Sequence, residues 1–325
     1  MAAFVLRRMA QAVIVLMAVG LLAFLMFRYV GDPVDQMVGI ETSLAERAAL
    51  RERLGLNDPP AVQYWRFVSN AARFEFGLSY RFRQPVSQMI LERLPATLEL
   101  SICSALLALA IGLPMGVYTG IRRSGFLSRL ILAGSLVGIS LPTFLIGILL
   151  IYIFAVQWHL LPSFGRGDTV DIGGWSTGLL TVSGLKALVL PSITLGLFQM
   201  ALIVRLVRSE MLEVMRTDFI RFARARGLSD RAVHFGHALK NTLVPVVTVM
   251  GLQLGSVIAF AIITETVFQW PGMGLLFLQA VQNADIPIMA AYLMLIAFVF
   301  VAINLAVDLI YMLLDPRLRI AGSRN

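Results

Sequence analysis

The chain has 325 residues, of which 58% are hydrophobic and only 14% are charged, and its formal net charge is +8. Soluble domains carry about 25% charged residues, so this composition excludes an ordinary soluble protein. It also argues against nucleic-acid binding, because the Lys and Arg residues follow the connections between apolar runs and do not form a polar surface with aromatic partners.

Six apolar runs are long enough to cross a bilayer, whose hydrocarbon core of about 30 Å requires about 20 residues per helix. Backbone groups inside lipid must be hydrogen-bonded within the segment, so each run is predicted to be a helix. The predicted fold class is all-α: a polytopic membrane protein with six transmembrane helices. The runs are residues 9–30, 97–121, 130–158, 187–207, 243–268 and 288–314.

The first run follows Arg7 and Arg8, as the apolar region of a signal peptide would. It is longer than such a region, however, and no small-x-small cleavage site follows it. We therefore expect a retained first helix within an N-terminal segment of residues 1–30.

The next connection, residues 31–95, is predicted to be an extracytoplasmic loop with short helices. Ser43 is a suitable N-cap for a helix over residues 43–54, and Asn57, Pro59 and Pro60 then favour a break. Residues 86–94 have the pattern of an amphipathic helix lying on the membrane surface. Residues 96–315 form the predicted transmembrane domain, with five helices, and residues 316–325 a cytoplasmic tail.

The distribution of Lys and Arg predicts the orientation. Six spans place both termini on one side, together with the connections 122–129 and 208–241, and this side has a clear excess of basic residues. By the positive-inside rule the N- and C-termini are cytoplasmic. Four tryptophans fall on the opposite side, as an interfacial aromatic belt would require: Trp65, Trp158, Trp175 and Trp270.

Small residues recur one helical turn apart in the second run, at Gly112, Gly116 and Gly120. This spacing lets helix backbones approach closely in lipid. Two interpretations remain open: the glycines serve packing alone, or they allow helices to slide or bend along a gated pathway.

The spans contain few ionisable residues, namely Glu99, Glu265 and Asp308, and each is a functional candidate by default. Glu99 and Glu265 lie near outer helix ends, where simple solvation is the plainer explanation. Asp308 lies deeper, where an internal partner such as an arginine is expected. The candidates for a translocation path or gate are Glu265, Gln253, Asp308 and Thr143.

The chain lacks the sequence patterns of an enzyme: it contains no HExxH, GxSxG or P-loop motif. Its single cysteine, Cys103, cannot form an intramolecular disulfide, and the three histidines are dispersed. We therefore predict no catalytic residue, no metal site and no cofactor in this chain.

The most basic connection, about residues 208–241, has an ordered pattern. Apolar residues of helical spacing run through residues 209–226. Gly227 then fits the position that ends a helix in a left-handed turn, and Ser229 fits the N-cap of a further helix from Asp230. Small residues beside arginines suit a helix that docks on an acidic partner; a simple positively charged loop is the alternative.

This connection resembles a known motif. "DFIRFARARGLS" (218–229) followed by "HALKNTLVPVVT" (237–248) is similar to the cytoplasmic EAA loop of ABC importer permeases, and most similar to the B-type subunit of the dipeptide/oligopeptide/nickel family. "TETVFQWPGMG" (264–274) and "DPRLR" (315–319) extend the resemblance over nearly the whole chain. The chain departs from the general motif, since "RFA" replaces Glu-Ala-Ala and the distance from Gly227 to Pro245 is longer. Both departures are usual in the peptide/nickel subgroup.

The resemblance implies a type I ABC importer permease fold in a bacterial inner membrane. It implies a second homologous permease, one or two ABC ATPase subunits that carry ATP and Mg, and a periplasmic or lipid-anchored substrate-binding protein as partners. Peptides are the expected cargo, with nickel, glutathione or oligosaccharide as alternatives. The residues implied in coupling to the ATPase are Arg221, Phe222, Ala223, Arg224, Ala225, Arg226 and Gly227.

Two other classes of protein are less consistent with the sequence. An ion-coupled secondary transporter would use Asp308 and Glu99 as ion or proton sites, but no two-half repeat of that class is visible in the sequence. An intramembrane enzyme would need a nucleophile with a base, and no such arrangement is visible.

Overall fold

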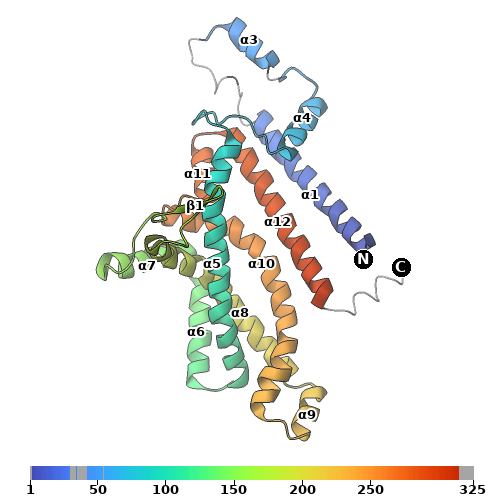
Figure 1. Cartoon of the computed structure of the whole chain (residues 1–325), viewed down its shortest axis with the longest axis vertical. Coiled ribbons are helices and arrows are strands. Elements are labelled where there is room, and N and C mark those ends of the chain that lie inside the picture. The colour runs from blue at the N-terminus through green and yellow to red at the C-terminus, as the bar shows by residue number, and fades with distance from the viewer. Residues whose placement is uncertain (1, 30–33, 35–41, 54, 315–325) are drawn as a thin grey trace.

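The computed structural model describes residues 2–29, 34, 42–53 and 55–314, and it describes the side chains of these residues except 2–5, 27, 244 and 308–314. The described chain is mainly helical (Figure 1). Its elements are α1 (Ala2–Tyr29), α3 (Leu44–Arg53), α4 (Pro60–Ala72), α5 (Val86–Ile121), α6 (Phe126–Ser140), α7 (Thr143–Leu150), the π-helix η1 (Ile151–Gln157), β1 (Val170–Ile172), β2 (Trp175–Thr177), α8 (Val182–Val214), α9 (Asp218–Ala225), the π-helix η2 (Ala232–Ala238), α10 (Leu239–Val267), α11 (Met273–Gln282) and α12 (Ile286–Leu314).

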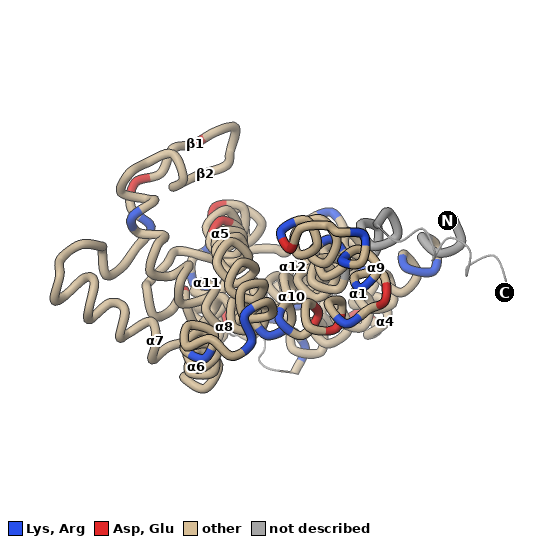
Figure 2. Tube along the Cα trace, turned by 90° about the horizontal axis from the view of Figure 1, so that it is seen from below, with Lys and Arg blue, Asp and Glu red and all other residues tan. Residues whose placement is uncertain are grey.

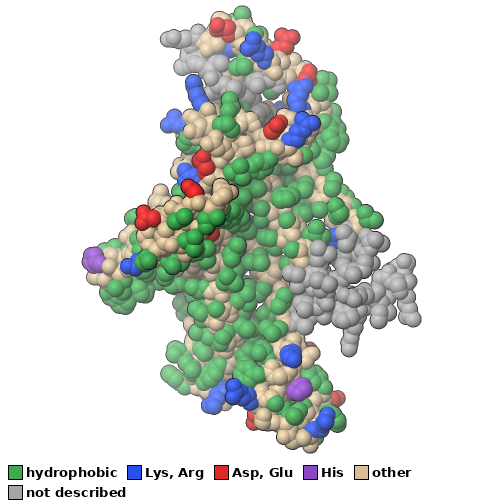
Figure 3. Space-filling view, in the orientation of Figure 1, with side chains coloured by type: hydrophobic (Ala, Val, Ile, Leu, Met, Phe, Trp, Pro, Cys, Tyr) green, Lys and Arg blue, Asp and Glu red, His purple; other side chains and the backbone are tan. Residues whose placement is uncertain are grey.

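The helices have the length and composition of membrane spans. Within the described residues, five helices are long and apolar enough to cross a bilayer, and the bent pair α6 and α7–η1 makes a sixth when counted as one span. Figure 3 shows hydrophobic side chains across the middle of one face, with most of the charged side chains gathered toward the two ends. The predicted polytopic helical fold is confirmed.

The third predicted span, residues 130–158, is not one helix. It is bent by 109° between α6 and α7, and Leu141 at the break has an extended backbone with φ −86° and ψ 137°. Pro142 causes the bend, because a proline disfavours the helical conformation of the residue before it and has no N–H to donate.

The centre of the molecule is the packing of α5 on α8, with α10 beside both. The three glycines of α5 face α8: a Cβ at Gly112, Gly116 or Gly120 would lie 3.1, 2.6 or 2.7 Å from a side-chain atom of Ile203, Val207 or Met211. These glycines therefore allow close packing of α5 on α8, and whether they also allow sliding is not tested, so both interpretations stay open.

The predicted surface helix over residues 86–94 is wrong, because α5 begins at Val86 and continues through Pro95 into the membrane span. Val86 and Ile90 are fully buried in a cluster with Met273 of α11 and Ile288 of α12. The apolar positions that suggested contact with lipid are thus in contact with protein.

The first connection contains the predicted short helix and a second one that was missed. Ser43 caps α3: the Glu46 N–H donates to its Oγ at 3.3 Å, and the Glu46 carboxylate accepts from the Ser43 N–H at 3.1 Å. The predicted break lies between α3 and α4, and α4 begins at Pro60, because proline is well suited to the first helical position. The Tyr64 hydroxyl donates to the carbonyl of Met17 and so ties α4 to α1.

Two further elements were also missed by the sequence prediction. The antiparallel strands β1 and β2 form a hairpin around Gly173 and Gly174, both with positive φ, and Figure 2 shows it projecting from the helices. The short helix α11 follows Gly272. Trp270 precedes it and is 1% exposed, so its assignment to an interfacial belt is wrong. Trp65, Trp158 and Trp175 are exposed, as a belt requires.

The two ends of the molecule are formed by different elements. In Figure 1, α9 lies at the end opposite α3 and α4, and α1 and α12 lie side by side. Their Ala2 and Leu314 ends both point away from α3 and α4. This arrangement agrees with the sidedness predicted from charge, which itself remains a prediction.

Candidate functional site

The knob, defined as residues 217–231, is the segment that the sequence singled out for coupling. The helical spacing noted over residues 209–226 is divided between two helices: α8 ends at Val214 and α9 begins at Asp218. Thr217 separates them with φ −69° and ψ 154°, and its hydroxyl donates to the Val214 carbonyl at 2.6 Å. The knob is therefore a separate helix set at an angle to the span.

The knob is anchored to the rest of the chain by a few apolar side chains. Ile220 is fully buried and Ala223 is 6% exposed, and both join a cluster that contains Met211 of α8 and Val233 of η2. The knob therefore packs on α8 and, through η2, is connected to α10.

The opposite face of α9 is open to solvent and carries aromatic and basic side chains. Phe222 is 63% exposed, and the Arg226 guanidinium lies 5.8 Å from the centre of its ring. Arg221 pairs with Asp218 at 3.2 Å, but both side chains are largely exposed, so this pair contributes only about 0–1 kcal/mol. Arg224 and Ala225 are also exposed.

The end of α9 has the predicted geometry. Gly227 has φ +76°, its N–H donates to the Arg224 carbonyl at 2.9 Å, and the Leu228 N–H donates to the Ala223 carbonyl at 3.3 Å. These two bonds form a Schellman motif, in which glycine is the preferred left-handed residue. The Ser229 hydroxyl then accepts from the Ala232 N–H at 3.4 Å, so the predicted second cap is confirmed as well.

The second candidate region, which we call the clasp, is built around the start of the α5 span: Thr97, Glu99, Arg166, Glu265 and Trp270. Arg166 lies before the hairpin and pairs with Glu99 at 2.6 Å, with both side chains no more than 7% exposed. Glu99 also accepts from the Trp175 indole at 3.1 Å and from the Gly178 N–H at 3.4 Å. The interpretation of Glu99 as a solvated residue is therefore wrong.

Glu265 is the other half of the clasp and is fully buried. Its carboxylate accepts from the Thr97 hydroxyl at 2.5 Å and from the Leu275 N–H at 2.9 Å. It thus lies at the positive N-terminal end of α11, where a carboxylate stabilises a helix. A Cβ at Gly272 would lie within 2.5 Å of this carboxylate, so the glycine is required. The expected solvation of Glu265 is wrong too.

Two hydrogen bonds to main-chain carbonyls complete the clasp. The Trp270 indole donates to the Ala96 carbonyl at 3.0 Å, and the Gly165 N–H donates to the Phe268 carbonyl at 2.9 Å. One turn of α5 therefore holds both the segment before the hairpin and the segment before α11.

A further buried carboxylate fixes the segment before α5. Asp285 accepts from the Ser79 hydroxyl at 2.5 Å and from the Tyr80 and Arg81 N–H groups at 3.2 and 3.1 Å. Burial, together with this neighbouring carboxylate, raises the pKa of the Tyr80 hydroxyl above its usual value. The tyrosine therefore stays neutral throughout the physiological range.

The remaining predicted path residues lie on three different helices. Thr143 is the first residue of α7 and is half-buried. Gln253 is half-buried in α10, where its carbonyl accepts from the Gln199 amide at 3.5 Å. Asp308 belongs to α12, but its side chain lies outside the described residues. The role of these residues, like that of Glu265, in a translocation path stays a prediction.

The clasp partners were not predictable from local sequence. Glu99 and Arg166 are 67 positions apart and Thr97 and Glu265 are 168 apart, and Arg166 lies in a segment rich in glycine and serine that gave no helical or strand pattern. The only available signal was the presence of two carboxylates within apolar runs.

Comparison with known proteins identifies the family to which this architecture belongs. The family described as "Binding-protein-dependent transport system inner membrane component" matches residues 112–320, and its N-terminal counterpart matches residues 1–101. In the solved inward-facing MetNI methionine ABC transporter, one chain superposes with a TM-score of 0.56 at 21% identity, over 70% of this chain and 96% of that chain. The fold is thus that of a type I ABC importer permease.

Curated relatives extend over nearly the full length. The dipeptide transport system permease protein DppB of Alkalihalophilus pseudofirmus is 37% identical, covering 98% of this chain and 100% of the relative. DppB of Escherichia coli K12 is 36% identical, over 97% and 98%. The probable peptide ABC transporter permease protein y4tP of Sinorhizobium fredii is 39% identical, over 98% and 100%. The chain belongs to the binding-protein-dependent transport system inner membrane components, and it is the permease subunit of an ABC importer.

Proposed function

We propose that this chain forms half of a peptide translocation path and is driven through the knob by a separate ATPase. The observation that carries the proposal is the exposed face of α9, which presents Phe222 and Arg224 to solvent. Ile220 and Ala223 on its other face are buried against the chain's own core. A helix held on one side and open on the other is suited to receive force from a docked protein.

The proposed mechanism follows from the connections of the knob. An ATPase whose groove carries acidic groups would hold the arginines of α9 by charge-assisted hydrogen bonds. When ATP closes the ATPase pair, the knob moves with it, and the cluster around Met211 and Val233 passes the displacement to α8 and α10. This permease would itself hydrolyse no ATP and need no cofactor of its own.

The proposed orientation follows from the same region. An ATPase works in the cytoplasm, so the knob must face the cell interior, and the basic excess on that side supports this placement. The N- and C-termini would then be cytoplasmic as well, in a bacterial inner membrane. The clasp and the hairpin would face outward, where a periplasmic or lipid-anchored binding protein delivers cargo.

Peptides are the proposed cargo because the relatives that cover nearly the full chain are named as dipeptide or peptide permeases. A second homologous permease would supply the other half of the path. Uptake of labelled dipeptide by the reconstituted assembly is the test; uptake of nickel, glutathione or an oligosaccharide in its place would overturn the peptide assignment.

The coupling role is tested by Arg224→Glu in the reconstituted assembly, with ATPase activity stimulated by the binding protein as the readout. We expect loss of stimulation, because the charge reversal faces the partner rather than the chain's own core. The matched control is Arg123→Glu, which makes the same charge change at an exposed position of the turn between α5 and α6. Equal stimulation in both variants would show that the knob is not the coupling element.

A second measurement separates this proposal from an ion-coupled secondary transporter. The purified chain alone, reconstituted in vesicles with an ion gradient, is expected to take up no peptide. Gradient-driven uptake by the single chain would contradict a role as a subunit.

A further inference from the structure

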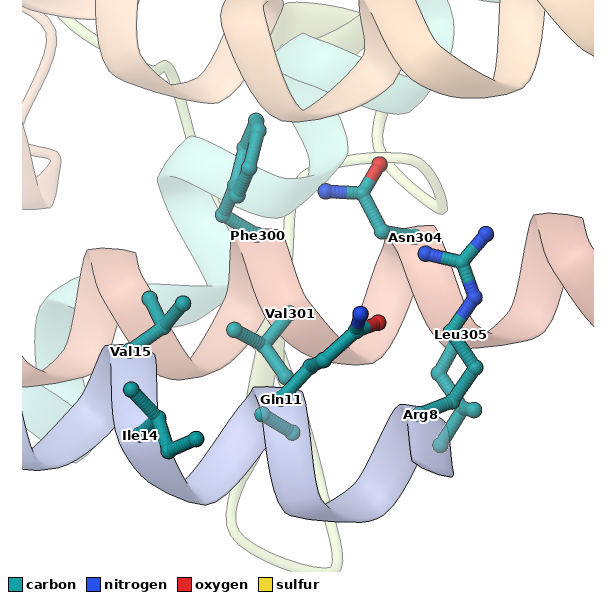
Figure 4. Close-up of a pocket in the computed structure, with 9 residues that line it drawn as sticks. Arg8, Gln11, Ile14, Val15, Phe300, Val301, Asn304 and Leu305 are labelled. Atoms are coloured by element: carbon teal, nitrogen blue, oxygen red, sulfur yellow. The ribbon is translucent and has the colours of Figure 1, made fainter. Parts of the chain in front are cut away.

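A cavity of about 390 Å³ lies between α1 and α12, away from both the knob and the clasp. Figure 4 shows α1 and α12 side by side, with the side chains that line the cavity between and around them. The cavity is lined by Arg8, Gln11, Ala12, Ile14, Val15, Phe300, Val301, Asn304 and Leu305.

The lining is divided into a polar and an apolar end. In Figure 4 the Arg8, Gln11 and Asn304 side chains lie toward one end, and Val15 and Phe300 lie toward the other. Arg8 is near the beginning of the membrane-spanning part of α1 and Asn304 is near the end of that of α12. The polar end is therefore at the level of lipid headgroups, and the apolar end extends into the hydrocarbon.

The surroundings of the cavity are apolar and exposed in the described chain. Leu6 and Ile14 of α1 are each 67% exposed, and Phe300 of α12 is 43% exposed. A hydrophobic surface of this kind inside a bilayer is covered by acyl chains.

The charge of the polar end selects an anion. Arg8 is the charged group among the lining residues. A guanidinium has five N–H donors, so it can bind a phosphate while keeping other partners. The chain's own residues 315–325 are a poor occupant, because Arg317, Arg319 and Arg324 outnumber the acidic Asp315.

We propose that this cavity binds an anionic phospholipid of the leaflet on the Arg8 side. Its phosphate is held by Arg8, with Gln11 and Asn304 as further hydrogen-bonding groups, and one acyl chain lies along Val15 and Phe300. Basic pockets between transmembrane helices are known to hold such headgroups. The lipid would add to the direct packing of α1 on α12; among the described residues α1 also packs on α4.

The test is native mass spectrometry of the purified full chain, exchanged into mixed micelles with equal phosphatidylglycerol and phosphatidylcholine. Retention of phosphatidylglycerol is expected to exceed that of phosphatidylcholine and to fall about tenfold in Arg8→Gln, since a hydrogen bond to a charged group is lost. Arg7→Gln is the matched control, because it removes the same charge at a position that does not line the cavity.

Asn304→Leu is a second variant that distinguishes a specific lipid site from a general charge effect or a changed insertion of α1. It leaves the net charge and the first helix unchanged, and it is expected to weaken phosphatidylglycerol retention several-fold. Crosslinks from a photoactivatable phosphatidylglycerol are expected on α1 and α12. Equal retention of the two lipids, equal losses in Arg7→Gln and Arg8→Gln, or crosslinks confined to other helices would overturn the proposal.

Discussion

The clasp and the knob differ in the burial of their charged side chains. In the clasp, Arg166 and Glu99 are buried and pair with each other at 2.6 Å. In the knob, the paired side chains of Arg221 and Asp218 are 73% and 94% exposed. The comparison shows that the clasp pairs its charges within the chain, whereas the knob leaves its charged side chains exposed to solvent, where we propose that the ATPase docks.

The two kinds of pair also differ in energy. Removing one partner of a buried ion pair leaves an uncompensated charge in a medium of low dielectric constant, whereas an exposed charge returns to water. Substitutions in the clasp should therefore change stability, and substitutions in the knob should change coupling while the fold persists.

The largest effect is expected for Arg166→Ala. It leaves the Glu99 carboxylate buried without its cation and should lower the free energy of unfolding by about 3–5 kcal/mol. The measurement is equilibrium unfolding of the purified chain in detergent micelles. Arg66→Ala is the control, because it breaks a pair of the same 2.6 Å length whose side chains are 47% and 39% exposed; it should cost less than about 1 kcal/mol. Similar losses in both variants would show that burial does not distinguish the two pairs.

A smaller loss of about 1–3 kcal/mol is expected for Thr97→Val, which removes a buried hydroxyl and leaves its partners unsatisfied. That hydroxyl donates to Glu265 of α10 and accepts from the Met273 N–H of α11 at 2.8 Å, so α5 loses one bond to each of these helices. Thr119→Val is the control, since the buried Thr119 hydroxyl bonds only a carbonyl of its own helix in the described structure. The prediction fails if the unfolding of Thr119→Val is affected as strongly.

Gly227→Ala should cost about 1–2 kcal/mol, because an alanine at φ +76° is strained in the left-handed region. No atom lies within 4 Å of the added Cβ among the described residues, so the loss comes from the backbone alone. Gly236→Ala is the control, as its Cβ is equally free and its φ is not in the left-handed region. Thermal unfolding of the two variants in detergent measures the difference, and equal midpoints would contradict the assigned strain.

The smallest effect on stability, about 0–1 kcal/mol, is expected for Arg221→Ala, because its pair with Asp218 is exposed. The same variant should clearly reduce ATPase stimulation by the binding protein. Asp218→Ala breaks the same pair but leaves the arginine in place, and it should keep most of the stimulation. A loss of stimulation in Asp218→Ala alone would assign the partner contact to the carboxylate.

Local signals explain what was predictable from sequence. Gly227 and Ser229 specify their turn and cap through bonds to residues within a few positions, so the end of the knob was predicted correctly. The clasp depends on contacts across 67 and 168 positions, which leave no periodic trace. The effect of proline on a helix was not predictable from sequence alone. Pro142 marks a 109° bend, whereas Pro191 lies inside a continuous helix, because tertiary packing decides between these outcomes.

The helix α8 connects the region of the hairpin with the knob. At about 1.5 Å per residue, its 33 residues extend for about 50 Å, from its cap at Thr181 next to the hairpin down to the break before α9. Rotating a rod of that length by about ten degrees about one end would shift the other end by about 9 Å, so a small change of tilt at one membrane face would correspond to a wide displacement at the opposite face.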